Sequence, residues 1–323
     1  MKILVTGSAG HLGEALMRSL ADSDHQAIGL DVRRSAYTQL CGSSQERGFV
    51  KCCMSGVDVV LHTATLHKPH IASHTRQDFV DTNITGTLHL LEEAVSAGVK
   101  AFVYTSTTSV FGDALTPPAG APAAWITEDV TPIPKNIYGV TKLAAENLCE
   151  LFQKNDGIST VVLRASRFFP EEDDDSERRR AYDDTNLKVN ELLYRRADIA
   201  DVVSAHLIAM QNASAIGFGR FIISATTPFS RNDLQELRTD VPAVLNRYVP
   251  QYESLYRQWG WTMLPSIDRV YVNDLARSRL GWQPRYDFGS VVARLRDSEY
   301  YGSDLARAVG SKGYHGRAGL DGM

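Results

Sequence analysis

Short apolar runs alternate with helical patterns through the first half of the chain. Six runs predict buried strands, the third of them weakly: 3–5, 27–30, 38–41, 57–61, 101–104 and 160–163. Apolar residues recur at helical spacing between Leu12 and Leu20, and longer helices are predicted at 77–97 and 138–155. This alternation predicts right-handed β-α-β units, and therefore an α/β fold with a doubly wound parallel sheet.

The pattern changes after the sixth strand. A charged run at 171–180 is typical of a solvated loop, and a strand near 218–225 is predicted to return to the sheet. We therefore expect a main domain over 1–165, completed by that returning strand. A small C-terminal α+β lobe is expected over 166–309, with further returns to the sheet. The glycine-rich segment 310–323 is predicted to be a flexible tail.

Composition narrows the class of protein. The chain has 323 residues, is 43% hydrophobic and carries a net charge of −4, which suits a packed core and offers no basic surface for nucleic acid. No run of apolar residues predicts a membrane span, and the amino terminus lacks the pattern of a secretory signal peptide. The four cysteines lack the spacing of a zinc site, so we expect reduced thiols in a cytoplasmic protein.

A glycine-rich turn joins the first strand to the first helix. Gly7, Gly10 and Gly13 allow a tight turn and let a pyrophosphate approach the backbone at the positive end of the helix. The strand–turn–helix context is the one that a dinucleotide site requires. Asp31 closes the second strand, where a carboxylate accepts hydrogen bonds from the ribose hydroxyls of NAD. Arg33 could instead receive the 2′-phosphate of NADP, so NAD is favoured and NADP stays open.

A second group of residues can carry acid–base chemistry. Tyr138 and Lys142 have four-residue spacing at the start of a predicted helix, which puts them on one face. A nearby ammonium is expected to lower the pKa of the tyrosine, so that it exchanges a proton with a substrate hydroxyl near neutral pH. The hydroxyl-rich turn after the fifth strand contains Thr107 and Thr108, either of which could hold the substrate oxygen.

Together these motifs resemble the extended short-chain dehydrogenase/reductase superfamily, and within it the NAD-dependent epimerase/dehydratase family. The resemblance covers roughly residues 1–300. It is carried by Asp31, the Tyr138/Lys142 pair and the stretches 6–13, 57–62, 83–87, 163–164, 201–203 and 280–284. It implies a Rossmann-type sheet, with Thr107 at the catalytic Ser/Thr position and Tyr138 as the acid/base. Lys142 is implied to bind the nicotinamide ribose and to tune Tyr138.

The remaining site residues and the assembly follow from the same comparison. Cofactor contacts are expected at Gly7, Ala9, Gly10, His11, Leu12, Gly13, Asp31, Arg33, Thr63, Ala64, Tyr138 and Lys142. The resemblance implies that Asn83 supports the active site or the cofactor loop. Family members often dimerise through the helices that correspond to 77–97 and 138–155, so a homodimer is expected.

The chain departs from nucleotide-sugar enzymes of the family after the sixth strand. Arg167 replaces the asparagine that typically contacts the sugar diphosphate, and Asp198 follows Pro170 by only 28 positions, so the nucleoside clamp is expected to be truncated. Arg167 could grip a carboxylate or phosphate of a smaller substrate, or it could pair with the acidic stretch 171–175. His67 is a further candidate substrate contact. No metal site is predicted, because Pro69 interrupts the histidine-rich stretch and no carboxylate accompanies it.

These observations favour an NAD(P)-dependent oxidoreductase that acts on a secondary hydroxyl of a small sugar-like substrate, as a dehydrogenase or a reductase. A nucleotide-sugar epimerase similar to UDP-glucose 4-epimerase, with transient hydride transfer, is the alternative. A non-catalytic dinucleotide-binding regulator is a second alternative, which the intact set of Thr107, Tyr138 and Lys142 disfavours.

Overall fold

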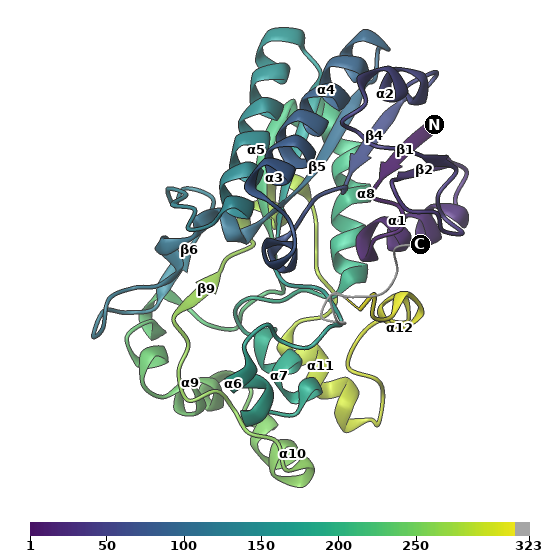
Figure 1. Cartoon of the computed structure of the whole chain (residues 1–323). Helices are drawn as coiled ribbons and strands as arrows, with labels where there is room; N and C mark the ends of the chain where they lie inside the picture. The colour runs from purple at the N-terminus through teal and green to yellow at the C-terminus, as the bar shows by residue number, and fades with distance from the viewer. Residues whose placement is uncertain (314–323) are drawn as a thin grey trace.

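Seven parallel strands form the central sheet of the computed structural model, which describes residues 1–313 (Figure 1). Their order is β3-β2-β1-β4-β5-β7-β8. Their bounds are Lys2–Thr6 (β1), Gln26–Asp31 (β2), Leu40–Cys41 (β3), Val59–His62 (β4), Ala101–Thr107 (β5), Ser159–Ala165 (β7) and Phe218–Ile223 (β8). The strand order reverses between β1 and β4, and ligands of such sheets bind beyond the carboxyl ends of the strands at this point. The predicted doubly wound, Rossmann-type sheet is confirmed.

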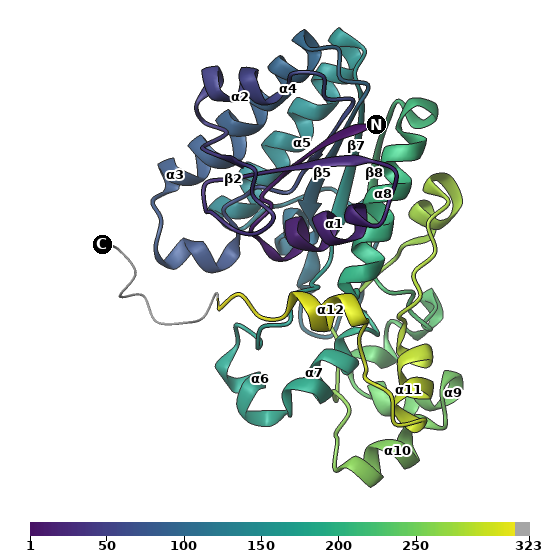
Figure 2. The ribbon, with the colours of Figure 1, turned by 90° about the vertical axis from the view of Figure 1, so that its right-hand side faces the viewer.

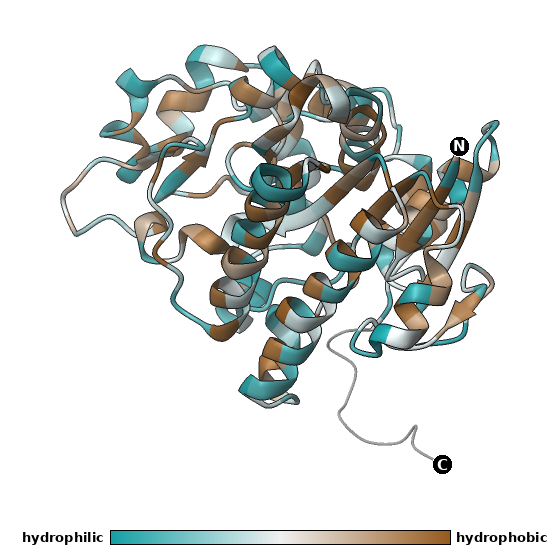
Figure 3. Ribbon diagram, turned by 90° about the horizontal axis from the view of Figure 1, so that it is seen from above, coloured by the Kyte–Doolittle hydropathy of each residue, from teal (hydrophilic) through white to brown (hydrophobic). Residues whose placement is uncertain are grey.

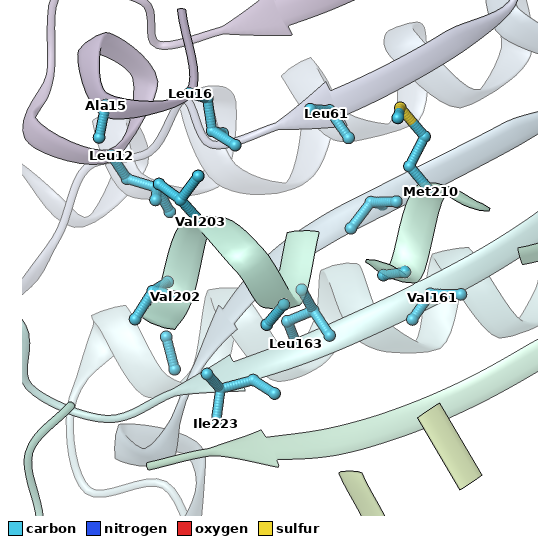
Figure 4. Packing of buried hydrophobic residues seen from close by; sticks show 14 of the residues in the cluster. Leu12, Ala15, Leu16, Leu61, Val161, Leu163, Val202, Val203, Met210 and Ile223 are labelled. Atoms are coloured by element: carbon cyan, nitrogen blue, oxygen red, sulfur yellow. The ribbon is translucent and has the colours of Figure 1, made fainter. Parts of the chain in front are cut away.

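Helices cover both faces of the sheet, which explains why its strands read as continuous apolar runs. Alternate residues of β1 point to opposite faces: Ile3 and Val5 join the core under α1 (His11–Ala21) and α8 (Ile199–Ile216), and Leu4 joins the core of the other face. Figure 4 shows the first of these cores from close by, with Leu16 and Val203 among its packed side chains. The other face is covered by the helices α2 (Arg47–Cys53), α4 (Gly86–Ser96) and α5 (Ile137–Asp156).

The helix predicted over 77–97 is interrupted. It consists of α3 (Arg76–Val80), a π-helical turn over Asp81–Thr85, and α4. Helix α5 runs without a break: the side chain of Asn136 caps its amino terminus by accepting a hydrogen bond from the Gly139 amide, and Gly157 ends it in a left-handed conformation. The uninterrupted α5 is therefore a rigid support for residues at its first turns.

A small α+β lobe lies below the carboxyl ends of the strands (Figure 1). Its two-stranded parallel sheet pairs β6 (Ala124–Ile126) with β9 (Arg269–Tyr271). Its helices are α6 (Ser176–Ala181), α7 (Asp184–Glu191), α9 (Val241–Tyr248), α10 (Tyr252–Trp259) and α11 (Phe288–Arg296). The lobe has an apolar core of its own, which includes Leu193, Val244 and Phe288. The lobe includes β6, which precedes the range 166–309 expected for it from the sequence.

The last described helix returns toward the sheet. Figure 2 shows α12 (Asp304–Val309) between the lobe and α1. Of the predicted flexible tail over 310–323, residues 314–323 lie outside the described part of the chain. Seen from above in Figure 3, hydrophobic colours dominate the central strands, while the flanking helices alternate between hydrophobic and hydrophilic. Within residues 1–313, no helix is long and apolar enough to cross a membrane.

Candidate active site

A cleft of about 860 Å³ lies at the carboxyl ends of the strands, between the sheet and the lobe. Almost all of the site residues predicted from the sequence line it: Gly7, Gly10, His11, Leu12, Gly13, Asp31, Arg33, Thr63, Ala64, His67, Thr107, Thr108, Tyr138 and Arg167. The two exceptions are Ala9, whose amide donates to Asp31, and Lys142, which is buried against the Tyr104 ring. The fold therefore brings the predicted cofactor and catalytic residues to one cavity.

The glycine loop has the shape that a pyrophosphate site requires. Gly7 adopts a left-handed conformation with φ +74°, and its amide donates to the Leu30 carbonyl. A Cβ atom on Gly13 would lie 1.9 Å from the Gly7 carbonyl oxygen, so only glycine fits where α1 meets the turn. Gly10 caps α1 and offers no side chain to its first amides. The backbone amides of this helix terminus suit an anionic bridge such as the pyrophosphate of NAD.

Asp31 stands at the end of β2, beside this turn. Its carboxylate accepts hydrogen bonds from the Ala9 amide at 3.0 Å and from the Arg33 amide at 2.8 Å. The Arg33 guanidinium is exposed and lies 4.0 Å from the same carboxylate. Both side chains that could distinguish NAD from NADP therefore face one end of the cleft.

A chain of hydrogen bonds fixes the ends of β1 and β4. The Thr6 hydroxyl accepts from the Ala64 amide and bonds to Nδ1 of His62, whose Nε2 bonds to the Thr87 hydroxyl. Burial lowers the pKa of His62 to about 3, so the ring is neutral and acts as a structural link. Thr63 also bonds to the Thr6 carbonyl. The predicted contacts Thr63 and Ala64 are thus held rigidly against the glycine loop.

Thr107 ends β5 beside Tyr138 in the first turn of α5, and Lys142 follows one turn later. The Thr107 hydroxyl accepts from the Ser109 amide at 3.1 Å. Burial raises the pKa of Tyr138 to about 12, against the smaller effect of the Thr107 hydroxyl. Burial likewise lowers the pKa of Lys142 to about 7, although Glu146 opposes that shift. The phenol is therefore protonated at neutral pH, and the charge of the lysine changes near neutrality.

The expected lowering of the Tyr138 pKa by Lys142 is wrong for this structure. The Lys142 Nζ atom lies 4.1 Å from the centroid of the Tyr104 ring, in a cation–π arrangement. Because both side chains are almost completely buried, loss of hydration disfavours the charged form of each. Sequence spacing places the two on one helix face but does not reveal their burial.

A buried carboxylate beneath the site was not found from the sequence. Glu146, one turn after Lys142, accepts from the Ser106 hydroxyl at 2.5 Å and from Nη2 of Arg164 at 2.8 Å. Both Glu146 and Arg164 are almost fully buried, and Arg220 adds a bond at 3.2 Å from its Nε. This network joins α5 to β5, β7 and β8 directly below Thr107. These residues lie on four different elements and come together only in the fold. Their spacing along the chain therefore gave no sign of the network.

Asn83 lies in the π-helical turn and connects two parts of the site. Its Oδ1 accepts from the Leu66 amide, and its Nδ2 donates to the Leu66 carbonyl and to the Thr141 hydroxyl. Thr141 lies between Tyr138 and Lys142 on α5. The side chain thus ties the loop after β4 to α5, and its support of the active site or the cofactor loop stays a prediction. A π turn in a long helix often marks a functional position.

The residues predicted to contact the substrate differ in their surroundings. Arg167 donates to the Glu172 carbonyl and lies 3.4 Å from the Asp173 carboxylate, which is the pairing with the acidic stretch 171–175 that the sequence left open. His67 stacks on Phe169 with ring centroids 5.4 Å apart, and burial lowers its pKa to about 3. Thr108 is buried at the start of the turn after β5. All three predicted residues line the cleft, and their contact with substrate stays a prediction.

The glycine loop also contacts the lobe segment through His11. Its Nε2 lies 2.8 Å from the Glu171 carboxylate, which also accepts from the Ser311 hydroxyl and the Lys312 amide. Although burial opposes ionisation, the bond to His11 lowers the pKa of Glu171 to about 2. A second contact joins Lys312 to Glu14 of α1. The described end of the chain is thereby attached to the cofactor loop.

Comparison with known proteins supports the assignment of the site to a family. The profile of the NAD dependent epimerase/dehydratase family matches residues 3–223. An uncharacterized UDP-glucose epimerase of Bacillus subtilis is 31% identical, over 51% of this chain and 55% of its own length. A 2-alkyl-3-oxoalkanoate reductase of Stenotrophomonas maltophilia is 32% identical, over 51% of this chain and 50% of its own. The chain thus spans about half the length of these curated relatives.

Solved structures support the fold over a greater length. A short-chain dehydrogenase/reductase superfamily protein of Agrobacterium tumefaciens, crystallised with NAD, superposes with a TM-score of 0.65. It covers 92% of this chain and 98% of its own, at 22% identity. A UDP-glucose 4-epimerase of Thermotoga maritima with UDP-glucose gives a TM-score of 0.62 at 22% identity, over 92% of this chain and 99% of its own. At this identity, the likeness extends to the fold alone.

Proposed function

Because this chain belongs to the NAD dependent epimerase/dehydratase family, a family of NAD-dependent enzymes, we propose that it oxidises a secondary hydroxyl of a small sugar-like substrate, or catalyses the reverse reduction. One observation carries the proposal. Thr107 and Tyr138 face the same cleft as the glycine loop, with Lys142 one turn behind Tyr138. A hydroxyl group held at Thr107 is then within reach of a proton acceptor and of the cofactor site.

The proposed roles follow from the surroundings of each side chain. Thr107 orients the substrate oxygen, and Tyr138 exchanges the proton of the reacting hydroxyl. NAD, when bound, supplies the hydride acceptor, and its reduced form the donor. With a pKa of about 12, Tyr138 holds its proton at neutral pH and is ready to protonate a carbonyl oxygen in the reductive direction. In the oxidative direction a charged Lys142 stabilises the tyrosinate.

The structure of the lobe supports the proposal of a small substrate rather than a nucleotide-sugar. Between β7 and α8 the chain forms only α6, α7 and short connections, and the acidic stretch 171–175 folds back onto Arg167 and His11. Those side chains are therefore held by the protein itself. The epimerase alternative is supported by several similar proteins that are UDP-glucose 4-epimerases. In that case the same residues would act on a UDP-sugar without net oxidation.

The remaining parts of the proposal concern cofactor, assembly and location. NAD is proposed over NADP because the negative charge of the Asp31 carboxylate would repel the 2′-phosphate of NADP. A homodimer is proposed through α4 and α5, and the half-exposed Val140 and Leu151 of α5 support it. We propose a cytoplasmic enzyme without a nucleic-acid partner, in keeping with its cysteines and its net charge of −4.

The test is a substrate panel with NAD and NADP in parallel. Free sugars and sugar acids are expected to produce NADH, followed by absorbance at 340 nm, whereas Tyr138→Phe is expected to lose at least about 100-fold in rate. Tyr248→Phe, which removes a hydroxyl bonded to Asp233, is the matched control, since neither residue lines the cleft. Conversion of UDP-glucose to UDP-galactose without net NADH would favour the epimerase. Full function of Tyr138→Phe would support a non-catalytic regulator.

A further inference from the structure

The cleft carries several cationic side chains on its substrate side, and most of them are neutralised by the protein. Arg167 and Arg195 both face Asp173, at 3.4 and 2.8 Å, and both also approach Glu191. Lys68 pairs with Asp174 at 3.2 Å. These groups form a charge cluster that stabilises the lobe, so they offer little free binding capacity to a ligand.

Arg269 differs from these cations. It lies on β9, lines the cleft, and its side chain is only 15% exposed. Its Nη1 donates to the adjacent Asp268 carboxylate at 3.0 Å, which holds the guanidinium from one side. Its Nε is buried, and within residues 1–313 neither Nε nor Nη2 has a hydrogen-bond acceptor. One edge of the guanidinium therefore has two unused donors.

An unused edge of this kind has a defined chemical complement. A buried donor without an acceptor costs about 1–3 kcal/mol. The Nε and Nη2 atoms of arginine match the spacing of two oxygens of a carboxylate or phosphate, which they bind in a bidentate manner. A neutral hydroxyl offers a single oxygen and satisfies only one of the donors. The environment of Arg269 therefore favours an oxyanion over a neutral group.

A second cation lies near the mouth of the same cleft. Lys135 lines it, is 52% exposed, and its Nζ is 3.9 Å from the Asp113 carboxylate, a loose pairing in water. It adds positive potential on the approach to the cleft without fixing a ligand. Arg269 would hold the anion, and Lys135 would attract it.

We propose that Arg269 binds an anionic group, a carboxylate or a phosphate monoester, on the sugar-like substrate. This inference rests on the proposed function and names its substrate class as acidic sugars. The sequence suggested Arg167 as the residue that binds an oxyanion. The present inference assigns this contact to Arg269 of β9, which the sequence did not indicate. A single guanidinium edge accommodates one such group.

The test compares binding of matched ligands to the protein saturated with NADH. D-galactose, D-galacturonate and D-galactose 6-phosphate differ only at one position, as neutral alcohol, carboxylate and phosphate. Calorimetry is expected to show that the wild type binds at least one of the anionic sugars about 10- to 100-fold more tightly than galactose, and that Arg269→Gln loses this preference. The stronger anion identifies the natural group as a carboxylate or a phosphate.

Variants and outcomes separate this inference from the proposed function. Arg269→Lys keeps the charge without the bidentate edge and should retain only part of the preference, which gives a second measurement should Arg269→Gln fold poorly. Arg257→Gln, an exposed position on α10, is the control and should keep the full preference. Equal binding of all three sugars, or a preference for an anionic sugar that survives Arg269→Gln, would overturn the inference. An Arg269-dependent preference without NADH production would leave the inference standing and reject the proposed oxidation.

Discussion

Removing the charge of Glu146 should destabilise the protein far more than removing the charge of its neighbour on the same helix. In Glu146→Gln, the Arg164 guanidinium stays buried without its anion, because the two side chains are only 3% and 0% exposed. The Ser106 hydroxyl loses a charged acceptor at the same time. Glu150→Gln, one turn further along α5, removes a carboxylate that is 28% exposed and pairs with Lys154 and Arg220.

The size of the difference follows from burial. Breaking a buried ion pair by removing one partner costs about 3–5 kcal/mol, since the remaining charge is neither hydrated nor paired. Loss of a pair that remains accessible to water costs about 0–1 kcal/mol. We therefore expect Glu146→Gln to lose roughly 2–5 kcal/mol more of the free energy of unfolding than Glu150→Gln. Adding Arg164→Met to Glu146→Gln should recover most of this loss, because an apolar side chain needs no counter-charge.

Urea unfolding followed by tryptophan fluorescence measures these differences. The slope of the free energy of unfolding against urea concentration should be the same in all variants, which shows that they unfold in the same transition. Activity of the proposed reaction should also fall in Glu146→Gln, because the network holds β5 and α5 together beneath Thr107. If the two glutamine variants differ by less than about 1 kcal/mol, the Glu146–Arg164 pair does not carry the stability assigned to it here. If Arg164→Met gives no recovery, the loss does not come from an uncompensated charge.

Three further predictions concern the cofactor site. Gly13→Ala should abolish NAD binding measured by fluorescence titration, because its Cβ would meet the Gly7 carbonyl at 1.9 Å; Gly48→Ala, with open space around it, should bind normally. Asn83→Ala should weaken NAD binding by about tenfold, from loss of the bonds to the loop after β4, and a normal affinity would contradict this role. For Lys142, the pKa of about 7 lies below its ordinary value of 10.5, so the unfolded chain binds more protons between these values. The stability of the cofactor-free wild type should therefore rise by about 1 kcal/mol per pH unit from pH 7 to 10 relative to Lys142→Met, and parallel curves for the two would exclude a neutral buried lysine.

Local pattern and spacing were sufficient for the sheet and the cofactor loop. The strands at 3–5 and 101–104 are short apolar runs with helices on both faces, and Gly13 fills a position where no side chain fits. Such features depend only on residues that are close together in the sequence, so the sequence is sufficient to predict them. The π turn at 81–85 could not be predicted in this way, because its apolar periodicity differs little from that of an α-helix.

The parts of the site that were missed are contacts between distant segments. Glu146 is 18 residues from Arg164, and His11 is 160 residues from Glu171, so neither pair has a sequence signature. Arg269 stands out only because Asp268 holds one side of its guanidinium and nothing within residues 1–313 accepts from the other. A residue type and its spacing predict what a side chain can do; the partners it has already bound decide whether it is free to do it.

The opposite pKa shifts of Tyr138 and Lys142 have a common cause and a consequence for catalysis. Burial disfavours charge on both, so without ligands the favoured state near neutral pH is a neutral phenol beside a lysine close to its pKa. Under the roles proposed for these residues, the reductive step would use the protonated phenol that burial already provides. The oxidative step would use the phenolate, which a charged Lys142 or another positive charge close to Tyr138 would stabilise. The pH dependence of the two proposed directions should therefore differ.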